Sequence, residues 1–168
     1  MPQNPELLHT VVVEDNPALC ESLVATLEEL ACVKVVATTG MEDSAVRWLT
    51  EHPDGWQLAI VDLFLRSGSG LHLVERLPPR GPLQKVVVFS NYVNASVRKH
   101  CAQLGVDAVF DKSTELDALV DYCARQGFLQ ASARRPYVAP GPSGSYGSPG
   151  RSPVAAPAAA AGPAAAAP

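Results

Sequence analysis

The sequence of 168 residues is short of positive charge and of long apolar runs, and each shortage excludes a class of protein. Lysine and arginine number 13 against 17 aspartates and glutamates, so the formal net charge of −4 leaves no basic surface for nucleic acid or an anionic membrane. No apolar run has the length of a membrane span, and the opening MPQNPELLHT lacks the charged and then apolar order of a secretory signal. These absences predict a cytoplasmic protein.

Paired cysteines are also absent. The chain has four cysteines and no CxxC motif, and each cysteine lies in a stretch typical of a helix or strand interior. They are Cys20, Cys32, Cys101 and Cys123. We therefore expect buried, reduced thiols in place of disulfides or a zinc site.

What the chain does contain is a regular alternation of short apolar runs and amphipathic segments. The expected strands are at residues 10–13, 33–37, 58–63, 85–90 and 107–111. The expected helices are at residues 17–30, 41–52, 71–77, 94–104 and 114–126, the last closed by Gly127. This alternation predicts the α/β class, as a flavodoxin-like, doubly wound, five-stranded parallel sheet of order 2-1-3-4-5 with helices on both faces.

The composition changes after the last expected helix. Residues 1–130 are predicted to form one domain, with its core at about 8–127. Residues 131–168 consist largely of Pro, Ala, Gly and Ser and cannot bury enough apolar surface to offset the entropy of ordering. We expect a disordered tail with no second folded domain; binding of a proline-rich piece to a partner is the alternative.

Polar side chains gather where the expected strands end. Glu14 and Asp15 follow the first strand, Asp62 lies near the end of the third, and Ser90 and Lys112 stand at the ends of the fourth and fifth. In the expected strand order these residues converge at one edge of the sheet. Taken alone, Asp62 fits a structural role, as a turn cap or as the partner of a lysine, as well as it fits a functional one.

Taken together, the set indicates phosphoryl chemistry. Crowded carboxylates need a cation because like charges raise one another's pKa, and Mg²⁺ suits such oxygen ligands while leaving positions for phosphate oxygens. Lys112 and the Ser90 hydroxyl are donors for a further phosphate oxygen. Asp62, on the central strand, is the best-placed nucleophile, and carboxylate attack on a phosphoryl group gives an aspartyl phosphate.

These segments resemble the receiver domain of two-component response regulators. The resemblance rests on VVVEDN, VDLFLRSGSGLHL, VVFSNY and FDKS, which stand in the family's order over about residues 8–127. It implies that Asp62 accepts a phosphoryl group from a histidine kinase or phosphotransfer protein, and that Ser90 and Lys112 contact that group. The implied Mg²⁺ ligands are Asp15, Asp62, the backbone carbonyl of Phe64 and, largely through water, Glu14.

The chain departs from the family pattern at the aromatic switch position of the fifth strand. Val109 stands there, and Phe110 beside it should face the other way because adjacent strand residues alternate. The loop after Asp62 also lacks the family's common proline.

Three interpretations follow. The first is a stand-alone response regulator that signals through an unknown downstream protein or a second copy of itself, and is no enzyme beyond its own phosphorylation and dephosphorylation. The second is a phosphate sink or relay intermediate without conformational output, which Val109 favours. The third is a haloacid-dehalogenase-like phosphatase, although that class places its nucleophile in a DxD motif where this chain has Glu14-Asp15-Asn16.

Overall fold

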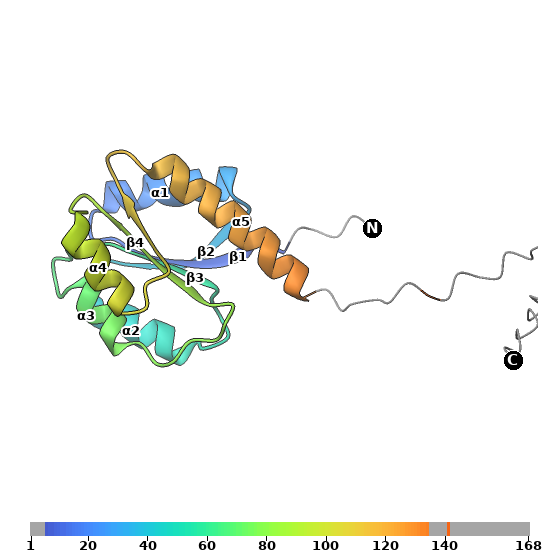
Figure 1. Cartoon of the computed structure of the whole chain (residues 1–168), viewed down its shortest axis with the longest axis horizontal. Coiled ribbons are helices and arrows are strands. Elements are labelled where there is room, and N and C mark those ends of the chain that lie inside the picture. Colours follow the sequence, from blue (N-terminus) through green and yellow to red (C-terminus); the bar gives the residue numbers. More distant parts are fainter. Residues whose placement is uncertain (1–5, 135–140, 142–168) are drawn as a thin grey trace, which may run out of the picture. The chain divides into compact units, whose positions relative to one another are not determined.

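The computed structural model describes residues 6–134 and residue 141, and within them strands and helices alternate as predicted (Figure 1). The strands are β1 (Leu8–Val13), β2 (Val33–Thr39), β3 (Leu58–Val61), β4 (Lys85–Ser90) and β5 (Ala108–Asp111). The helices are α1 (Pro17–Leu30), α2 (Glu42–Glu51), α3 (Gly70–Arg76), α4 (Ala95–Gln103) and α5 (Leu116–Arg134).

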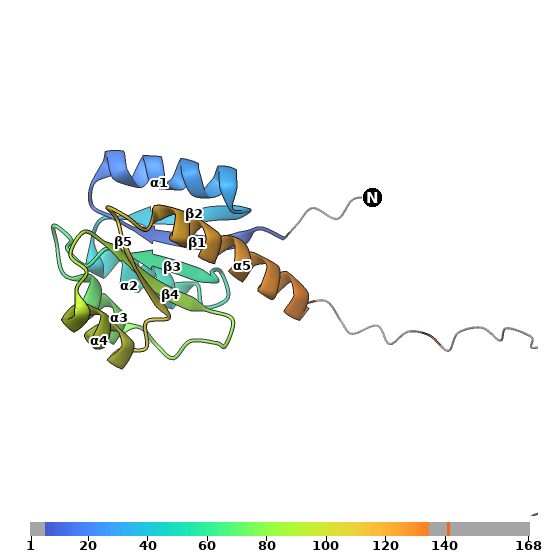
Figure 2. The same cartoon turned by 45° about the horizontal axis from the view of Figure 1, so that its top comes forward.

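All strands are parallel and follow the order β2-β1-β3-β4-β5, which confirms the predicted doubly wound topology. Helices α1 and α5 cover one face of the sheet, and α2, α3 and α4 cover the other (Figures 1 and 2). Because every strand runs the same way, the carboxyl ends of all five lie along one edge. The predicted site residues belong to that edge.

The core consists of two main layers of buried side chains, one on each side of the sheet. Leu27 of α1 and Leu119 of α5 are buried on the first side, while Ala45 and Leu49 of α2 are buried on the second. The central strand β3 is buried at every position, as its unbroken apolar sequence requires.

The start of α1 holds the first acidic segment in place. The Asn16 side chain accepts hydrogen bonds from the amides of Ala18 at 3.0 Å and Leu19 at 3.1 Å, and Pro17 occupies the first turn. This confirms the predicted cap. The chain therefore turns into α1 directly after Glu14 and Asp15, which leaves both acids at the end of β1.

Helix α5 is longer than predicted. It continues through Gly127 to Arg134, so the expected end at Gly127 is wrong. Glycine disfavours a helix interior by about 1 kcal/mol, but tertiary contacts hold the last turns. The buried Gln130 donates to the Leu83 carbonyl at 2.6 Å, and Arg134 lies 3.4 Å from Glu6.

The chain divides into two units, Met1–Arg135 and Pro136–Pro168. The first four residues of the predicted disordered tail are helical, since α5 includes Ala131–Arg134. The rest of that prediction, apart from residue 141, lies outside the described residues.

All four cysteines are free, but one of them is not where the sequence suggested. Cys101 and Cys123 are buried and Cys20 is half-buried, whereas Cys32 is exposed in the turn between α1 and β2 with φ at 51°. The prediction of a buried thiol is therefore wrong for Cys32, because a left-handed turn residue is needed to reverse the chain there. Within the described residues, no helix has the length and apolar character needed to cross a membrane.

Candidate functional site

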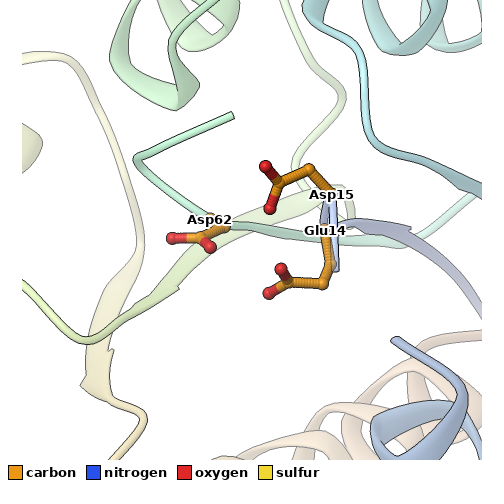
Figure 3. A group of neighbouring side chains, drawn as sticks. All are labelled: Glu14, Asp15 and Asp62. Atoms are coloured by element: carbon orange, nitrogen blue, oxygen red, sulfur yellow. The ribbon is translucent and has the colours of Figure 1, made fainter. Parts of the chain in front are cut away.

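Three carboxylates meet at the carboxyl edge of the sheet. Val13 and Val61 are paired in the β1–β3 ladder, so the residues that follow them lie side by side, and the Asp62 amide donates to the Val13 carbonyl at 2.9 Å. Carboxylate oxygens of Glu14, Asp15 and Asp62 all lie within 4.8 Å of one another. Figure 3 shows the three carboxyl groups turned towards a common space.

Lys112 enters the same space from the end of β5. Its ammonium donates to Asp62 Oδ2 at 2.7 Å and also to Glu14 Oε2. The side chains of Lys112, Glu14 and Asp62 are only 10%, 5% and 11% exposed, so these are well-shielded ion pairs. The Lys112 amide donates to the Ser90 carbonyl at 3.0 Å, which ties the segment carrying Lys112 to the end of β4.

Burial and charge act on these groups in opposite directions. Burial raises the pKa of Glu14 above its ordinary value, and the hydrogen bond from Lys112 offsets part of this. Burial alone would lower the pKa of Lys112, but its hydrogen bonds to Asp62 and Glu14 outweigh that effect and raise the pKa. The ammonium is therefore firmly charged, and the carboxylates around it remain short of positive charge.

Asp15 completes the group on its open side. Within the described part of the chain its one ion pair is with Arg66, whose Nε lies 3.9 Å away on a side chain that is 79% exposed. Three carboxylates thus face one buried ammonium and one loosely held guanidinium. A hard divalent cation with oxygen ligands fits this donor set, because it would supply the missing charge and accept carboxylate oxygens directly.

Ser90, at the end of β4, and Phe64, in the loop after β3, lie next to this group. Ser90 is fully buried at the end of β4, and its hydroxyl oxygen accepts a hydrogen bond from the Tyr92 amide at 3.3 Å. The Phe64 amide donates weakly to Asp62 Oδ1 at 3.4 Å. The Phe64 ring is exposed and packs edge-on against Tyr92 with centroids 4.6 Å apart, so two aromatic rings stand beside the acids.

The loop from β3 to α3 is closed on itself directly behind Asp62. The Gly70 amide donates to the Leu63 carbonyl at 3.0 Å, and Phe64 and Ser69 form an isolated antiparallel bridge. A Cβ on Gly70 would lie 2.1 Å from the Asp62 carbonyl oxygen, so only glycine allows this approach.

One buried polar residue next to this group was not predicted from the sequence. Glu42, at the start of α2, is only 5% exposed, and its Oε2 accepts from the Ser69 amide at 2.7 Å. A glutamate in the first turn of a helix is common, so the sequence pattern contained little sign of this contact. The sequence feature that relates to this contact is Gly68, because the absence of a side chain there leaves room for the Glu42 carboxylate.

The switch position behaves as the alternation of strand residues predicts. Val109 packs with Leu63, Val88 and Cys101 on the α4 side of the sheet. Phe110 belongs to the core on the other face, where its ring lies 5.6 Å from that of Tyr122. Phe110 therefore does not replace the aromatic ring that is missing at Val109.

Comparison with known proteins agrees with the geometry. The sequence pattern of the family described as "Response regulator receiver domain" matches residues 10–124. A search of curated proteins found no match.

Solved structures with the same fold include several receiver domains, all at low sequence identity. The signal receiver domain of the putative response regulator NarL from Mycobacterium tuberculosis is 20% identical with a TM-score of 0.61, and the match covers 78% of this chain and 100% of that one. CheY in the CheX–CheY–BeF3–Mg²⁺ complex from Borrelia burgdorferi is 13% identical with a TM-score of 0.61, covering 68% and 84%. The Mn²⁺-bound form of response regulator Rcp1 is 20% identical with a TM-score of 0.55, covering 70% and 90%. At these identities the likeness concerns the fold.

Proposed function

Because the chain belongs to the response regulator receiver domain family, we propose that it accepts a phosphoryl group on Asp62 from a histidine kinase or a phosphotransfer protein. The observation that carries the proposal is the hydrogen bond of 2.7 Å between Lys112 Nζ and Asp62 Oδ2, within a group of three carboxylates. A capping or merely paired aspartate would not need two further acids beside it.

The residues divide the chemistry among them. An Asp62 carboxylate oxygen attacks the phosphorus atom, the bond from phosphorus to the donor's imidazole nitrogen breaks, and that nitrogen keeps the electron pair. Lys112 donates to a phosphoryl oxygen as it loses part of its contact with Asp62. The Ser90 hydroxyl, at the end of the neighbouring strand, is the proposed second donor.

The proposed metal site consists of Asp15, Asp62 and the backbone carbonyl of Phe64, with Glu14 acting largely through water. Mg²⁺ bound there would neutralise charge on the acids and on the phosphoryl oxygens. The CheY structure named above contains Mg²⁺ and BeF3, and the Rcp1 structure contains Mn²⁺. The ions in these structures support the proposal because the proteins share the fold of this chain. The excess of negative charge around Asp15 supports it independently.

We further propose that the chain acts as a cytoplasmic, stand-alone regulator whose output is a protein contact, with no enzymatic activity beyond its own phosphorylation and dephosphorylation. A phosphate sink or relay intermediate remains the second candidate because Val109 occupies the switch position. The phosphatase interpretation is dropped, because the family pattern covers the same residues that suggested it.

The phosphoryl proposal is tested by incubating the full chain with Mg²⁺ and acetyl phosphate and measuring its intact mass. We expect the wild type to gain one phosphoryl group and Asp62→Asn to gain none. Asp54→Asn, at an exposed loop position, is the matched control and should behave as the wild type. Equal labelling of wild type and Asp62→Asn would overturn the assignment.

A separate measurement distinguishes a regulator from a sink. Candidate partners, including a second copy of the chain, are titrated with and without beryllofluoride, which mimics the phosphoryl group. Moving a two-state population from one in a hundred to ninety-nine in a hundred needs about 5.5 kcal/mol of differential binding. A regulator shows different affinities in the two conditions; a sink shows phosphoryl uptake and equal affinities.

A further inference from the structure

Glu42 has more polar contacts with its surroundings than an ordinary surface glutamate. Its Oε2 accepts from the Ser69 amide at 2.7 Å, and its Oε1 lies 2.8 Å from Arg76 Nη1 and 2.5 Å from His72 Nδ1. The Arg76 hydrogen bond, followed by that of Ser69, lowers the pKa of Glu42, so the carboxylate is charged at neutral pH. A buried carboxylate with this many donors has a fixed position.

The contacts of Glu42 reach the loop that follows Asp62. Ser69 forms the backbone bridge with Phe64, and Phe64 is the residue whose carbonyl is the proposed metal ligand. The Glu42 amide also donates to the Ser67 carbonyl at 3.1 Å, so both ends of this residue are bonded to the same loop. The start of α2 is therefore attached to the loop by side chain and backbone together.

Gly68 provides the space that Glu42 fills. Its φ is +97°, and a Cβ added there would lie 2.3 Å from Glu42 Oε2 and 2.4 Å from Glu42 Cβ. The carboxylate thus occupies the volume that a side chain at position 68 would otherwise take. Glycine at 68 and glutamate at 42 form a matched pair in this chain.

We infer that Glu42 is a positioning residue for the metal site, acting through Ser69 to hold the backbone of Phe64 in the orientation that binds the cation. The inference rests on the proposed function, because it assigns a role to a residue behind the proposed ligand. Residues that orient a metal ligand from behind affect metal affinity by about 10-fold to 100-fold when they are replaced.

The test is calorimetric titration of the full chain with Mg²⁺ at a temperature where circular dichroism shows every variant to be folded. Glu42→Ala should raise the Mg²⁺ dissociation constant about tenfold. Gly68→Ala should have a similar effect although it leaves residue 42 unchanged, because the added Cβ displaces the Glu42 carboxylate. Ser69 and Arg76 donate to different oxygens of Glu42, and Glu42→Gln turns one of those oxygens into an NH₂ donor, so this variant keeps one of the two hydrogen bonds and its value should be intermediate.

Asp43→Ala is the matched control. Asp43 also accepts from Arg76, at 2.6 Å, but it is exposed and makes no contact with the loop in the described hydrogen-bond network. Its dissociation constant should stay within about twofold of the wild type, because exposed ion pairs contribute little. If Asp43→Ala weakens Mg²⁺ binding as much as Glu42→Ala, the Arg76 contact and not the loop is responsible, and the inference fails.

Acetyl phosphate labelling separates positioning from general stability. At saturating Mg²⁺ the labelling rate of Glu42→Ala should approach that of the wild type, with only the half-saturating Mg²⁺ concentration raised. If Glu42 merely stabilises the fold, Glu42→Ala would lower the melting temperature and leave the dissociation constant unchanged, which would overturn the inference.

If the wild type binds no Mg²⁺ at all, the proposed function itself fails. If Glu42→Ala does not fold, Gly68→Ala and Glu42→Gln decide the matter, and wild-type affinity in both contradicts the inference.

Discussion

Glu14 and Glu42 are two buried glutamates at the same edge of the sheet, and their surroundings are opposite in charge. Glu14 shares one ammonium, that of Lys112, with Asp62 and lies beside Asp15. Glu42 accepts hydrogen bonds from a backbone amide and from the Arg76 guanidinium, which Asp43 shares, and it also contacts the His72 imidazole. Accordingly, burial raises the pKa of Glu14, whereas the Arg76 hydrogen bond lowers the pKa of Glu42.

The difference is between a group with more acids than cations and a carboxylate whose hydrogen-bond donors are all supplied by the chain. A carboxylate whose charge is fully matched stabilises the fold and has no requirement for a further ion. In a group with more acids than cations the carboxylates repel one another, and binding a cation relieves this repulsion. Charge balance around a buried acid, and not burial alone, distinguishes Glu14, whose group has more acids than cations, from Glu42, whose donors are already present.

The largest expected effect comes from removing the only buried cation that Glu14 contacts among the described residues. Lys112→Met leaves Glu14 and Asp62 uncompensated and should lower the free energy of unfolding by about 3 kcal/mol in EDTA. Mg²⁺ should restore more stability to this variant than it adds to the wild type, because the anionic charge has grown. Urea denaturation with and without Mg²⁺ measures both effects. An unchanged unfolding midpoint in EDTA would show that Glu14 and Asp62 do not depend on Lys112 for charge compensation.

Neutralising one acid in each region should change stability in opposite directions. Without Mg²⁺, Asp15→Asn should raise the free energy of unfolding by about 1 kcal/mol, because it relieves repulsion in a crowded group. Glu42→Gln should lower it by about 1 kcal/mol, because it weakens hydrogen bonds with charged partners. Thermal unfolding of both variants checks this, and changes of the same sign would remove the contrast between the two regions.

The pH dependence of the same two glutamates should also have opposite slopes. The pKa of Glu42 is lowered on folding, so its stabilisation is present above the unfolded value near 4.5 and is lost as pH falls through the folded pKa. The pKa of Glu14 is raised, so its contribution is present below about 4.5 and is lost as pH rises through the folded pKa.

Stability curves from pH 3 to pH 7 in EDTA test this difference. With rising pH, Glu42→Gln should become progressively less stable than the wild type, and Glu14→Gln progressively more stable. Parallel curves for the two variants would contradict the assigned pKa directions.

The smallest effect is expected at Arg66. This side chain is 79% exposed and lies 3.9 Å from Asp15, so Arg66→Ala should change the free energy of unfolding by less than about 0.5 kcal/mol. Its Mg²⁺ dissociation constant should stay within about twofold of the wild type. A larger change in affinity would mean that Arg66 already compensates the acids, and the contrast with Glu42 would be weaker than proposed.

The sequence was sufficient for the fold and for the acids, because both depend on local patterns. Apolar runs that end in polar residues mark the carboxyl edge of a parallel sheet, which is why Asp62 and Lys112 could be placed together across 50 positions of the chain. Their metal and phosphoryl roles remain predictions that the experiments above address.

The errors and the omission have a common cause in tertiary contacts. Gly127 is a helix terminator by propensity, but Gln130 and Arg134 find partners elsewhere in the chain and extend α5 beyond it. Cys32 looked like an interior residue, but the reversal between α1 and β2 exposes it. The contacts of Glu42 could not be predicted, because Gly68 and Ser69 belong to the loop between β3 and α3, far from Glu42 in the sequence.

Calorimetric titration of the wild type and Asp15→Asn with Mg²⁺ tests the central claim most directly. If acids outnumber cations at this edge in order to hold a metal, the wild type takes up one Mg²⁺ per chain and Asp15→Asn takes up almost none. No uptake by the wild type, or equal uptake by both proteins, would contradict the claim.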